Sequence, residues 1–290
     1  MRPARSVLFL PASNPRAIDK ARALPCDVAI LDLEDAVAPE AKDAARSAAV
    51  EAVRAGGFAP RLGVRINGLD TPWGDADLEA FGGTGVELIV APKVEDAAAV
   101  RSLAGRVPAG AALWAMIETP GALLDLPALA RAAAATPLEA LMLGVNDLAV
   151  GLGIGAAPDR EPLKPWLAAT VAAARAHGLL AIDGVWNDFS DADGLAAECA
   201  QARSYGFDGK SLIHPSQIEP ANLAFSPTAE EAAQARRRRR SASAAGWSSG
   251  FISPQPGACW PVSTRAAERR IQSVQKQNAP GKARERIGIP

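Results

Sequence analysis

Short runs of apolar residues recur along the first 235 positions, and a turn and an alanine-rich segment follow each run. Because these runs are almost continuously apolar rather than alternating, they predict strands buried on both faces, as in a parallel sheet covered by helices. We predict eight strands, near Val7–Leu10, Val28–Leu33, Gly63–Ile66, Leu88–Ala91, Leu113–Ile117, Ala140–Leu143, Leu180–Ile182 and Lys210–Ile213. The segments between them predict helices, among them Pro39–Arg54, Ala97–Leu103, Gly121–Ala134, Pro165–His177 and Ala192–Tyr205.

Eight strand–helix units fit a closed barrel, and an open doubly wound sheet is the alternative. Polar residues that follow the apolar runs favour the barrel, because its strand ends open on one shared face where active sites lie. These residues include Asn14, Asp32, Glu34, Asp35, Arg65, Asn67, Lys93, Glu118, Asp147, Asp183 and Lys210. We therefore predict an α/β protein with a (β/α)₈ barrel over residues 1–235.

The composition places the chain among cytoplasmic globular proteins. Hydrophobic residues make up 49% and charged residues 22% of the 290 positions, which suits a large buried core. No apolar run approaches the roughly 18 residues of a membrane helix, so we expect no membrane partner. The apolar run Val7–Leu10 is too short for the core of a signal peptide. Three widely spaced cysteines predict neither a disulfide framework nor a zinc site.

The charge is distributed unevenly along the chain. Residues 236–290 hold 12 Lys/Arg and 2 Asp/Glu and contain neither Leu nor Asp, whereas residues 1–235 hold 19 and 30. The run Arg236–Arg240 is of a kind that binds nucleic acid or an acidic membrane surface. Since no aromatic residues are interleaved with it, we expect no nucleic-acid partner.

Two carboxylates are candidate metal ligands. Glu118 and Asp147 are each the first acid after a buried apolar strand, and these two strands are consecutive in the prediction. Two oxygen ligands that leave positions for water and substrate suit Mg²⁺. Helix capping is the alternative for each residue alone, because both lie where a helix is predicted to begin. The matched pair favours the metal.

A single arginine and a dense acidic run accompany this pair. Arg65 ends an otherwise apolar strand, where a guanidinium can hold a substrate carboxylate with two parallel hydrogen bonds. The run Asp32–Asp35 contains three acids, which would repel one another unless they held cations, Arg65 or ordered water. We take Arg65, Glu34 and Asp35 as candidate catalytic residues. A structural ion pair of Arg65 with Glu34 or Asp35, and a solvated acidic loop, are the alternatives.

Six stretches of the chain, in order and spacing, resemble the citrate lyase β-subunit-like group of the HpcH/HpaI aldolase family, which includes malyl-CoA lyases. The resemblance covers residues 5 to 235. The stretches are Ser6–Pro15, Ile30–Val37, Val64–Asn67, Ala115–Pro120, Gly144–Leu148 and Ile213–Gln217.

The resemblance implies a barrel of the phosphoenolpyruvate/pyruvate type and a Mg²⁺-dependent carbon–carbon lyase that forms a homotrimer or hexamer. Its substrate would be a 3-hydroxyacyl-CoA thioester such as malyl-, citramalyl- or citryl-CoA. Glu118 and Asp147 would be the metal ligands, with Glu118 also in contact with the substrate. Arg65 would contact the substrate carboxylate and carbonyl, and Asp35 would lie near the metal. The implied CoA-binding positions are Asn14, Arg16 and Lys20.

The chain departs from the family after residue 235, where members usually continue with a helix and a lid that covers a neighbouring subunit's active site. We expect residues 236–290 to be either a disordered tail or the product of a reading-frame shift in place of that lid. Two alternative functions therefore stay open. One is a 2-oxo acid aldolase of the same family that needs no CoA, and the other is a lid-less protein that binds ligand without turnover.

Overall fold

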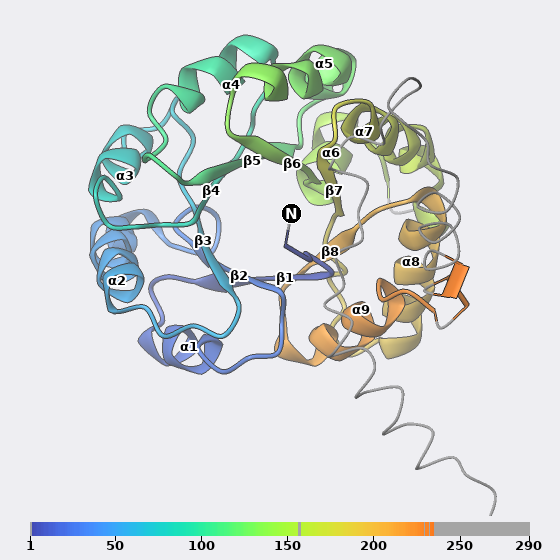
Figure 1. Ribbon diagram of the computed structural model, residues 1–290, viewed down its shortest axis with the longest axis horizontal. Helices are drawn as coiled ribbons and strands as arrows, with labels where there is room; N and C mark the ends of the chain where they lie inside the picture. Colours follow the sequence, from blue (N-terminus) through green and yellow to red (C-terminus); the bar gives the residue numbers. More distant parts are fainter. Residues whose placement is uncertain (1, 156–157, 229, 232, 235–290) are drawn as a thin grey trace, which may run out of the picture. The chain divides into compact units, whose positions relative to one another are not determined.

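Eight parallel strands close into a barrel with helices around it in this computed structural model (Figure 1). The strands pair in chain order, and the last pairs with the first. They are β1 (Ser6–Pro11), β2 (Val28–Asp32), β3 (Arg61–Arg65), β4 (Leu88–Ala91), β5 (Ala112–Ile117), β6 (Leu138–Leu143), β7 (Leu180–Asp183) and β8 (Gly209–Leu212). The predicted (β/α)₈ barrel is confirmed, and the open sheet is wrong.

The structure describes residues 2–155, 158–228, 230–231 and 233–234, which from Ala4 onward belong to one structural unit. The basic segment 236–290 lies outside the described residues, so its disorder or frame shift stays a prediction. Among the described residues, no helix is long and apolar enough to cross a membrane.

The helices that connect the strands include four short ones, α1, α3, α6 and α9, whose bounds are not among those predicted, although the sequence predicts that a helix begins at Asp147, where α6 lies. Each of these four has seven residues. The helices are α1 (Pro15–Ala21), α2 (Lys42–Ala55), α3 (Gly74–Ala80), α4 (Ala97–Ala104), α5 (Pro120–Arg131), α6 (Val145–Gly151), α7 (Lys164–Ala176), α8 (Ala192–Tyr205) and α9 (Ile218–Ala224). The 3₁₀ turns are η1 (Pro39–Ala41), η2 (Ala132–Ala135), η3 (Pro158–Leu163) and η4 (Pro215–Gln217).

The strands are apolar on both faces because one face fills the barrel interior and the other packs against helices. All five residues of β2 are buried. Inside the barrel, a Cβ on Gly63 of β3 would lie 2.7 Å from Ile30 Cδ1 and 2.8 Å from Leu88 Cδ2. Glycine is therefore required at position 63, where large side chains from the adjacent strands β2 and β4 fill the space.

A buried ionic network joins the last two strands to α8. The Lys210 ammonium is fully buried and donates to Asp183 Oδ2 at 2.8 Å, Glu198 Oε1 at 2.6 Å and the Gly184 carbonyl at 2.6 Å. Arg160 Nη1 of η3 donates to Asp183 Oδ1 at 2.7 Å. Burial raises the pKa of Asp183, but the neighbouring Lys210 and Arg160 outweigh it and hold this pKa below its ordinary value.

We expect Asp183→Asn to lower the free energy of unfolding by about 3–5 kcal/mol, because the buried Lys210 and Arg160 would lose their shared anion. The control is Asp75→Asn, which removes an exposed pair with Arg106 and should change stability by less than about 1 kcal/mol. Urea denaturation measures both. Since the folded-state pKa of Asp183 is lowered, its stabilisation is present above its ordinary pKa of 3.8 and is lost as the pH falls below that value. Equal stability losses in the two variants would contradict the network's importance.

Candidate active site at the carboxyl end of the barrel

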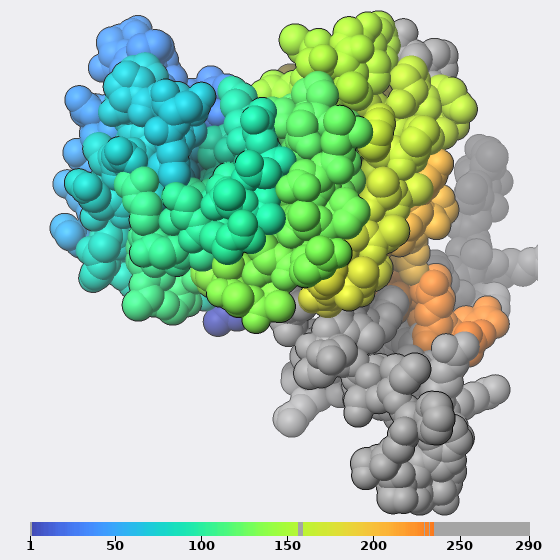
Figure 2. Space-filling view, turned by 90° about the horizontal axis from the view of Figure 1, so that it is seen from above, coloured from blue at the N-terminus to red at the C-terminus, as the bar shows by residue number. Residues whose placement is uncertain are grey.

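A cavity of about 360 Å³ opens at the carboxyl ends of the strands. Figure 2 shows the surface hollowed between the blue segment that follows β2 and the yellow-green segment that follows β6. The charged residues that line the cavity are Asp32, Asp35, Arg65, Glu118 and Asp147. Charged residues from four strand ends or the loops after them (β2, β3, β5 and β6) therefore meet in one polar space, as the barrel prediction requires.

Arg65 is fixed by an acid on the adjacent strand. Asp32 and Arg65 are register partners on β2 and β3. Arg65 Nε donates to Asp32 Oδ1 at 2.7 Å and Nη2 to Asp32 Oδ2 at 2.5 Å, a two-bond clasp between a guanidinium and a carboxylate. The remaining nitrogen, Nη1, lies 2.8 Å from Glu34 Oε2 and 3.4 Å from Asp35 Oδ2. Both ion pairs weighed from the sequence are present, but the main partner is Asp32, which we did not predict.

Glu34 is a buried acid between two cations. Its side chain lies against Arg65 on one side, and Lys93 Nζ is 3.5 Å from Glu34 Oε1 on the other. Burial, with the charges of Asp35 and Glu118, raises the pKa of Glu34 to about 7, although the two cations oppose this shift. A solvated acidic loop is therefore wrong for Glu34, while Asp35 is mostly exposed.

Glu118 points into the cavity from the end of β5. Its Oε1 accepts the backbone N–H of Lys93 at 2.7 Å, and Lys93 has a left-handed backbone with φ of 50°. A Cβ on Gly144 would collide with Glu118 Oε2, so glycine at 144 leaves room for this carboxylate. Burial, together with the charge of Asp147, raises the pKa of Glu118 to about 7. Glu118 does not cap α5, because Thr119 Oγ1 does so by accepting from Ala122 N at 3.2 Å.

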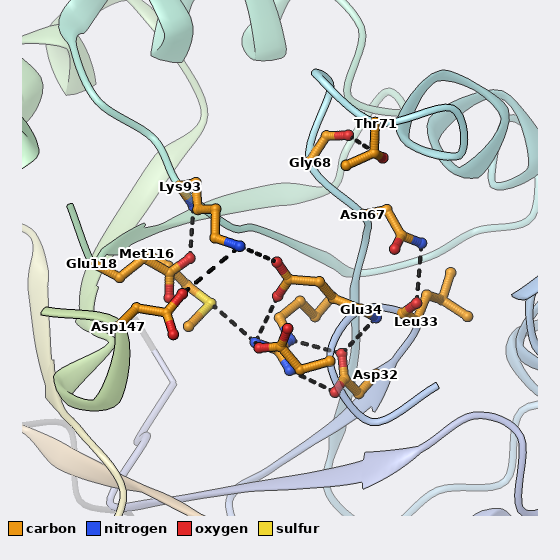
Figure 3. Close-up of polar contacts among 12 residues, drawn as sticks. Asp32, Leu33, Glu34, Asn67, Gly68, Thr71, Lys93, Met116, Glu118 and Asp147 are labelled. Carbon is orange, nitrogen blue, oxygen red and sulfur yellow. Dashed lines mark hydrogen bonds and ion pairs between the residues drawn. The ribbon is translucent and has the colours of Figure 1, made fainter. Parts of the chain in front are cut away.

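Asp147 lies beside Glu118 in the same cavity, in the first turn of α6 (Figure 3). Its Oδ2 is 3.7 Å from Lys93 Nζ, and its side chain is 41% exposed. The adjacent Asn146 exchanges two amide hydrogen bonds with Asn187 from the loop after β7, at 3.2 and 2.8 Å. This pair ties the segment that carries Asp147 to the next strand.

The donor set fits a hard divalent cation. Five carboxylates stand around the cavity with two cations, Arg65 and Lys93. Glu34 and Glu118 are buried, and burial raises the pKa of each to about 7. The nearby positive charges are therefore not enough to offset the cost of burying the two carboxylates. Within the residues that the structure describes, no three His, Cys, Asp or Glu side chains form a ligand shell. Two carboxylates completed by water and substrate are a set that Mg²⁺ uses.

The predicted CoA-binding residues lie next to the cavity rather than in it. Pro11 lines the cavity, and α1 begins four residues later. Asn14 Oδ1 caps α1 by accepting from Ala17 N at 3.2 Å. The side chains of Arg16 and Lys20 are exposed on this helix. They are available to an anionic ligand that extends out of the cavity.

Paired acids and an arginine at the carboxyl end of a parallel barrel define a class of barrel enzymes that act on small acids. Residues 5–215 match the model of the HpcH/HpaI aldolase/citrate lyase family, and the chain belongs to this family. The predicted family and the carbon–carbon lyase type of enzyme are thereby confirmed.

Similar proteins include enzymes named for malyl-CoA. The chain is 46% identical over 237 residues to a (3S)-malyl-CoA thioesterase of Cereibacter sphaeroides, covering 81% of this chain and 82% of that protein. It is 36% identical to an L-malyl-CoA/beta-methylmalyl-CoA lyase of the same species, covering 81% and 83%. Protein CitE of Mycobacterium tuberculosis, in complex with magnesium, acetoacetate and coenzyme A, is 34% identical with a TM-score of 0.69, covering 94% and 98%.

We expect Asp32→Ala to lower the free energy of unfolding by about 3 kcal/mol, because it leaves the buried Arg65 guanidinium without its two-bond partner. It also removes the acceptor for the backbone N–H groups of Glu34 and Ala36. Thermal and urea unfolding test this, with Asp35→Ala as the matched control at 63% side-chain exposure, for which the loss should stay below about 1 kcal/mol. A greater loss in the Asp35 variant than in the Asp32 variant would refute the assignment of Asp32 as the main partner.

Proposed function

We propose that the protein is a Mg²⁺-dependent lyase that cleaves, or in reverse forms, the carbon–carbon bond of a 3-hydroxyacyl-CoA thioester, with malyl-CoA as the leading substrate and citramalyl- and citryl-CoA as the others. The observation that supports this is the meeting of Glu118, Asp147 and Arg65 in one cavity. The names of the C. sphaeroides relatives supply the malyl-CoA class. The homotrimer or hexamer and the cytoplasmic location stay predictions.

The contacts of the cavity residues suggest a role for each of them in the proposed reaction. Glu118 and Asp147 would hold Mg²⁺, which when bound polarises the oxo oxygen of the 2-oxo acid fragment as a Lewis acid. Asp32 occupies Arg65 Nε and Nη2, and Glu34 and Asp35 face Nη1. A substrate carboxylate would therefore have to share Nη1 with these two acids. This nitrogen lies 3.9 Å from the sulfur of Met116, which lines the cavity. Glu34 and Asp35 place negative charge beside Arg65 and keep its orientation fixed.

The purified protein, incubated with Mg²⁺ and each of the three CoA thioesters, should release acetyl-CoA and the matching 2-oxo acid from at least one of them. Glu118→Ala and Asp147→Ala should each lower turnover by at least about 100-fold, because each removes one of two protein ligands to the metal. Mn²⁺ binding followed by electron paramagnetic resonance gives a readout besides activity. The exposed Glu95→Ala is the control and should change neither quantity. Full metal affinity in both acid variants would reject the assignment.

Thioester hydrolysis is a second candidate, favoured by the 46% identity to a (3S)-malyl-CoA thioesterase, against 36% to the lyase. The two reactions of malyl-CoA give different products. Carbon–carbon cleavage gives acetyl-CoA and glyoxylate, whereas hydrolysis gives malate and free CoA. The same incubation, with a thiol reagent to detect free CoA and chromatography to detect acetyl-CoA, separates them. An inert protein that still binds metal would support the ligand-binding alternative without turnover.

We expect the double variant Arg16→Ala/Lys20→Ala to weaken CoA binding by about tenfold, since each exposed cation can pair with a phosphate group of CoA. Calorimetry with CoA in the presence of Mg²⁺ measures the change. Arg54→Ala removes an exposed cation from the last turn of α2 and is the control. Equal CoA affinity in the wild type and the double variant would remove this segment from the binding site. No CoA affinity in the wild type would favour the CoA-independent 2-oxo acid aldolase.

A further inference from the structure

One buried hydroxyl group at the wall of the cavity lacks a hydrogen-bond partner. Ser211 on β8 is 2% exposed and lines the cavity, and its Oγ has no partner among the described residues. Side chains alternate between the two faces of a strand. Lys210 points outward to α8, so Ser211 faces the inside of the barrel. A buried hydroxyl without a partner costs free energy, which a ligand in the cavity would recover.

A second buried serine, Ser6, has a hydroxyl group with hydrogen-bond partners and serves as a comparison for Ser211. Ser6 on β1 is the register partner of Lys210, one position along from Ser211. It donates to Asn222 Oδ1 at 2.8 Å and accepts from Asp27 N at 3.0 Å. The barrel therefore satisfies a buried hydroxyl on its outer face through its own groups. Thr170 Oγ1 and Trp186 Nε1 are also without a partner among the described residues, but neither residue lines the cavity.

The surroundings of Ser211 indicate which ligand atom it would meet. On its side of the cavity the lining residues are Phe9, Leu10, Pro11, Val185, Asn187 and Ile213, while the acids and Arg65 come from strands β2, β3 and β5 and the segment after β6. A carboxylate would find its charged partner at Arg65. The Asn187 amide on this side is already paired with Asn146. A mainly apolar wall with one unpaired hydroxyl donor suits a carbonyl oxygen flanked by carbon and sulfur.

We propose that Ser211 Oγ donates a hydrogen bond to the carbonyl oxygen of the bound thioester. The proposal rests on the proposed function only in its choice of a CoA thioester as ligand. In carbon–carbon cleavage, a base takes the proton of the 3-hydroxyl group, which becomes the oxo group of the 2-oxo acid. The electron pair of the broken bond moves into the acyl fragment and leaves negative charge on this oxygen as an enolate, whose carbon then takes a proton to give acetyl-CoA. In hydrolysis, water adds to the carbonyl carbon and the same oxygen becomes the oxyanion of the tetrahedral intermediate. A donor at this point binds the charged state more strongly than the ground state in both reactions.

The test compares acetyl-CoA with S-ethyl-CoA, a thioether that lacks the carbonyl oxygen. Calorimetry with Mg²⁺ present should show that Ser211→Ala weakens acetyl-CoA binding by about fivefold and leaves S-ethyl-CoA binding unchanged. Ser211→Thr keeps the hydroxyl and should restore the wild-type ratio of the affinities for acetyl-CoA and S-ethyl-CoA. With a substrate that turns over, Ser211→Ala should lower kcat by about 100-fold, because the hydrogen bond is strongest to the charged oxygen.

The control is Ser6→Ala, which should lower the melting temperature without changing the ratio of the two affinities. Ser211→Ala should keep the wild-type melting temperature, since the hydroxyl has no partner in the part of the chain that the structure describes. Equal weakening of both ligands, no weakening of either, or a loss of stability like that of Ser6→Ala would overturn the proposal. If the wild type converts malyl-CoA while Ser211→Ala behaves like wild type, the proposed function stands and the role of Ser211 falls. If the wild type neither binds acetyl-CoA nor converts a thioester, both fall.

Discussion

The excess of negative charge at the carboxyl end of the barrel is the constraint on which the site depends. Each acid there is compensated to a different degree. Asp32 has two charged hydrogen bonds from Arg65, whereas Glu34 shares Arg65 and Lys93 with other acids. Glu118 is 4% exposed, and it accepts a hydrogen bond from the neutral backbone N–H of Lys93, while Arg65 and Lys93 act on it through their charges. An added cation would therefore stabilise the ionised form of Glu118.

Side chains on the outer face of β7 and β8 support the cavity wall. Lys210 and Ser211 are consecutive on β8, and they face opposite sides of the barrel wall. Lys210 fastens β8 to Asp183 at the end of β7, and the loop that follows β7 carries Asn187, the partner of Asn146. The segment with Asp147 is thus held through side-chain bonds that lead to a buried ion pair outside the cavity. Sites of this kind need such support, since small displacements of a ligand residue weaken metal binding.

Much of this arrangement could be predicted from the sequence because the barrel repeats one simple pattern. The apolar runs located all eight strands, and the acids and the arginine after β2, β3, β5 and β6 located the cavity. Asp183 and Lys210 also follow or lie in apolar runs, but they form a buried network with α8 instead. The bounds of the four seven-residue helices were missed because their apolar faces are too short to show a period. The clasp of Arg65 by Asp32 was missed because it depends on strand register, which places position 32 opposite position 65. Neither the left-handed turn at Lys93 nor the absence of a partner for Ser211 has a sequence signature.

The difference between the two activities named in the relatives need not lie in the groups described above. Cleavage of the carbon–carbon bond and hydrolysis of the thioester both place negative charge on the thioester oxygen, so a donor at that oxygen favours both. In the proposed function, Arg65 and the paired acids would bind the opposite end of the same acyl chain in either case. What differs is the nucleophile: hydrolysis needs a water molecule at the thioester carbon, whereas cleavage proceeds without one. If the proposed thioester binds here, the side of the cavity lined by Phe9, Val185 and Ile213 is where access of water would decide between the two reactions.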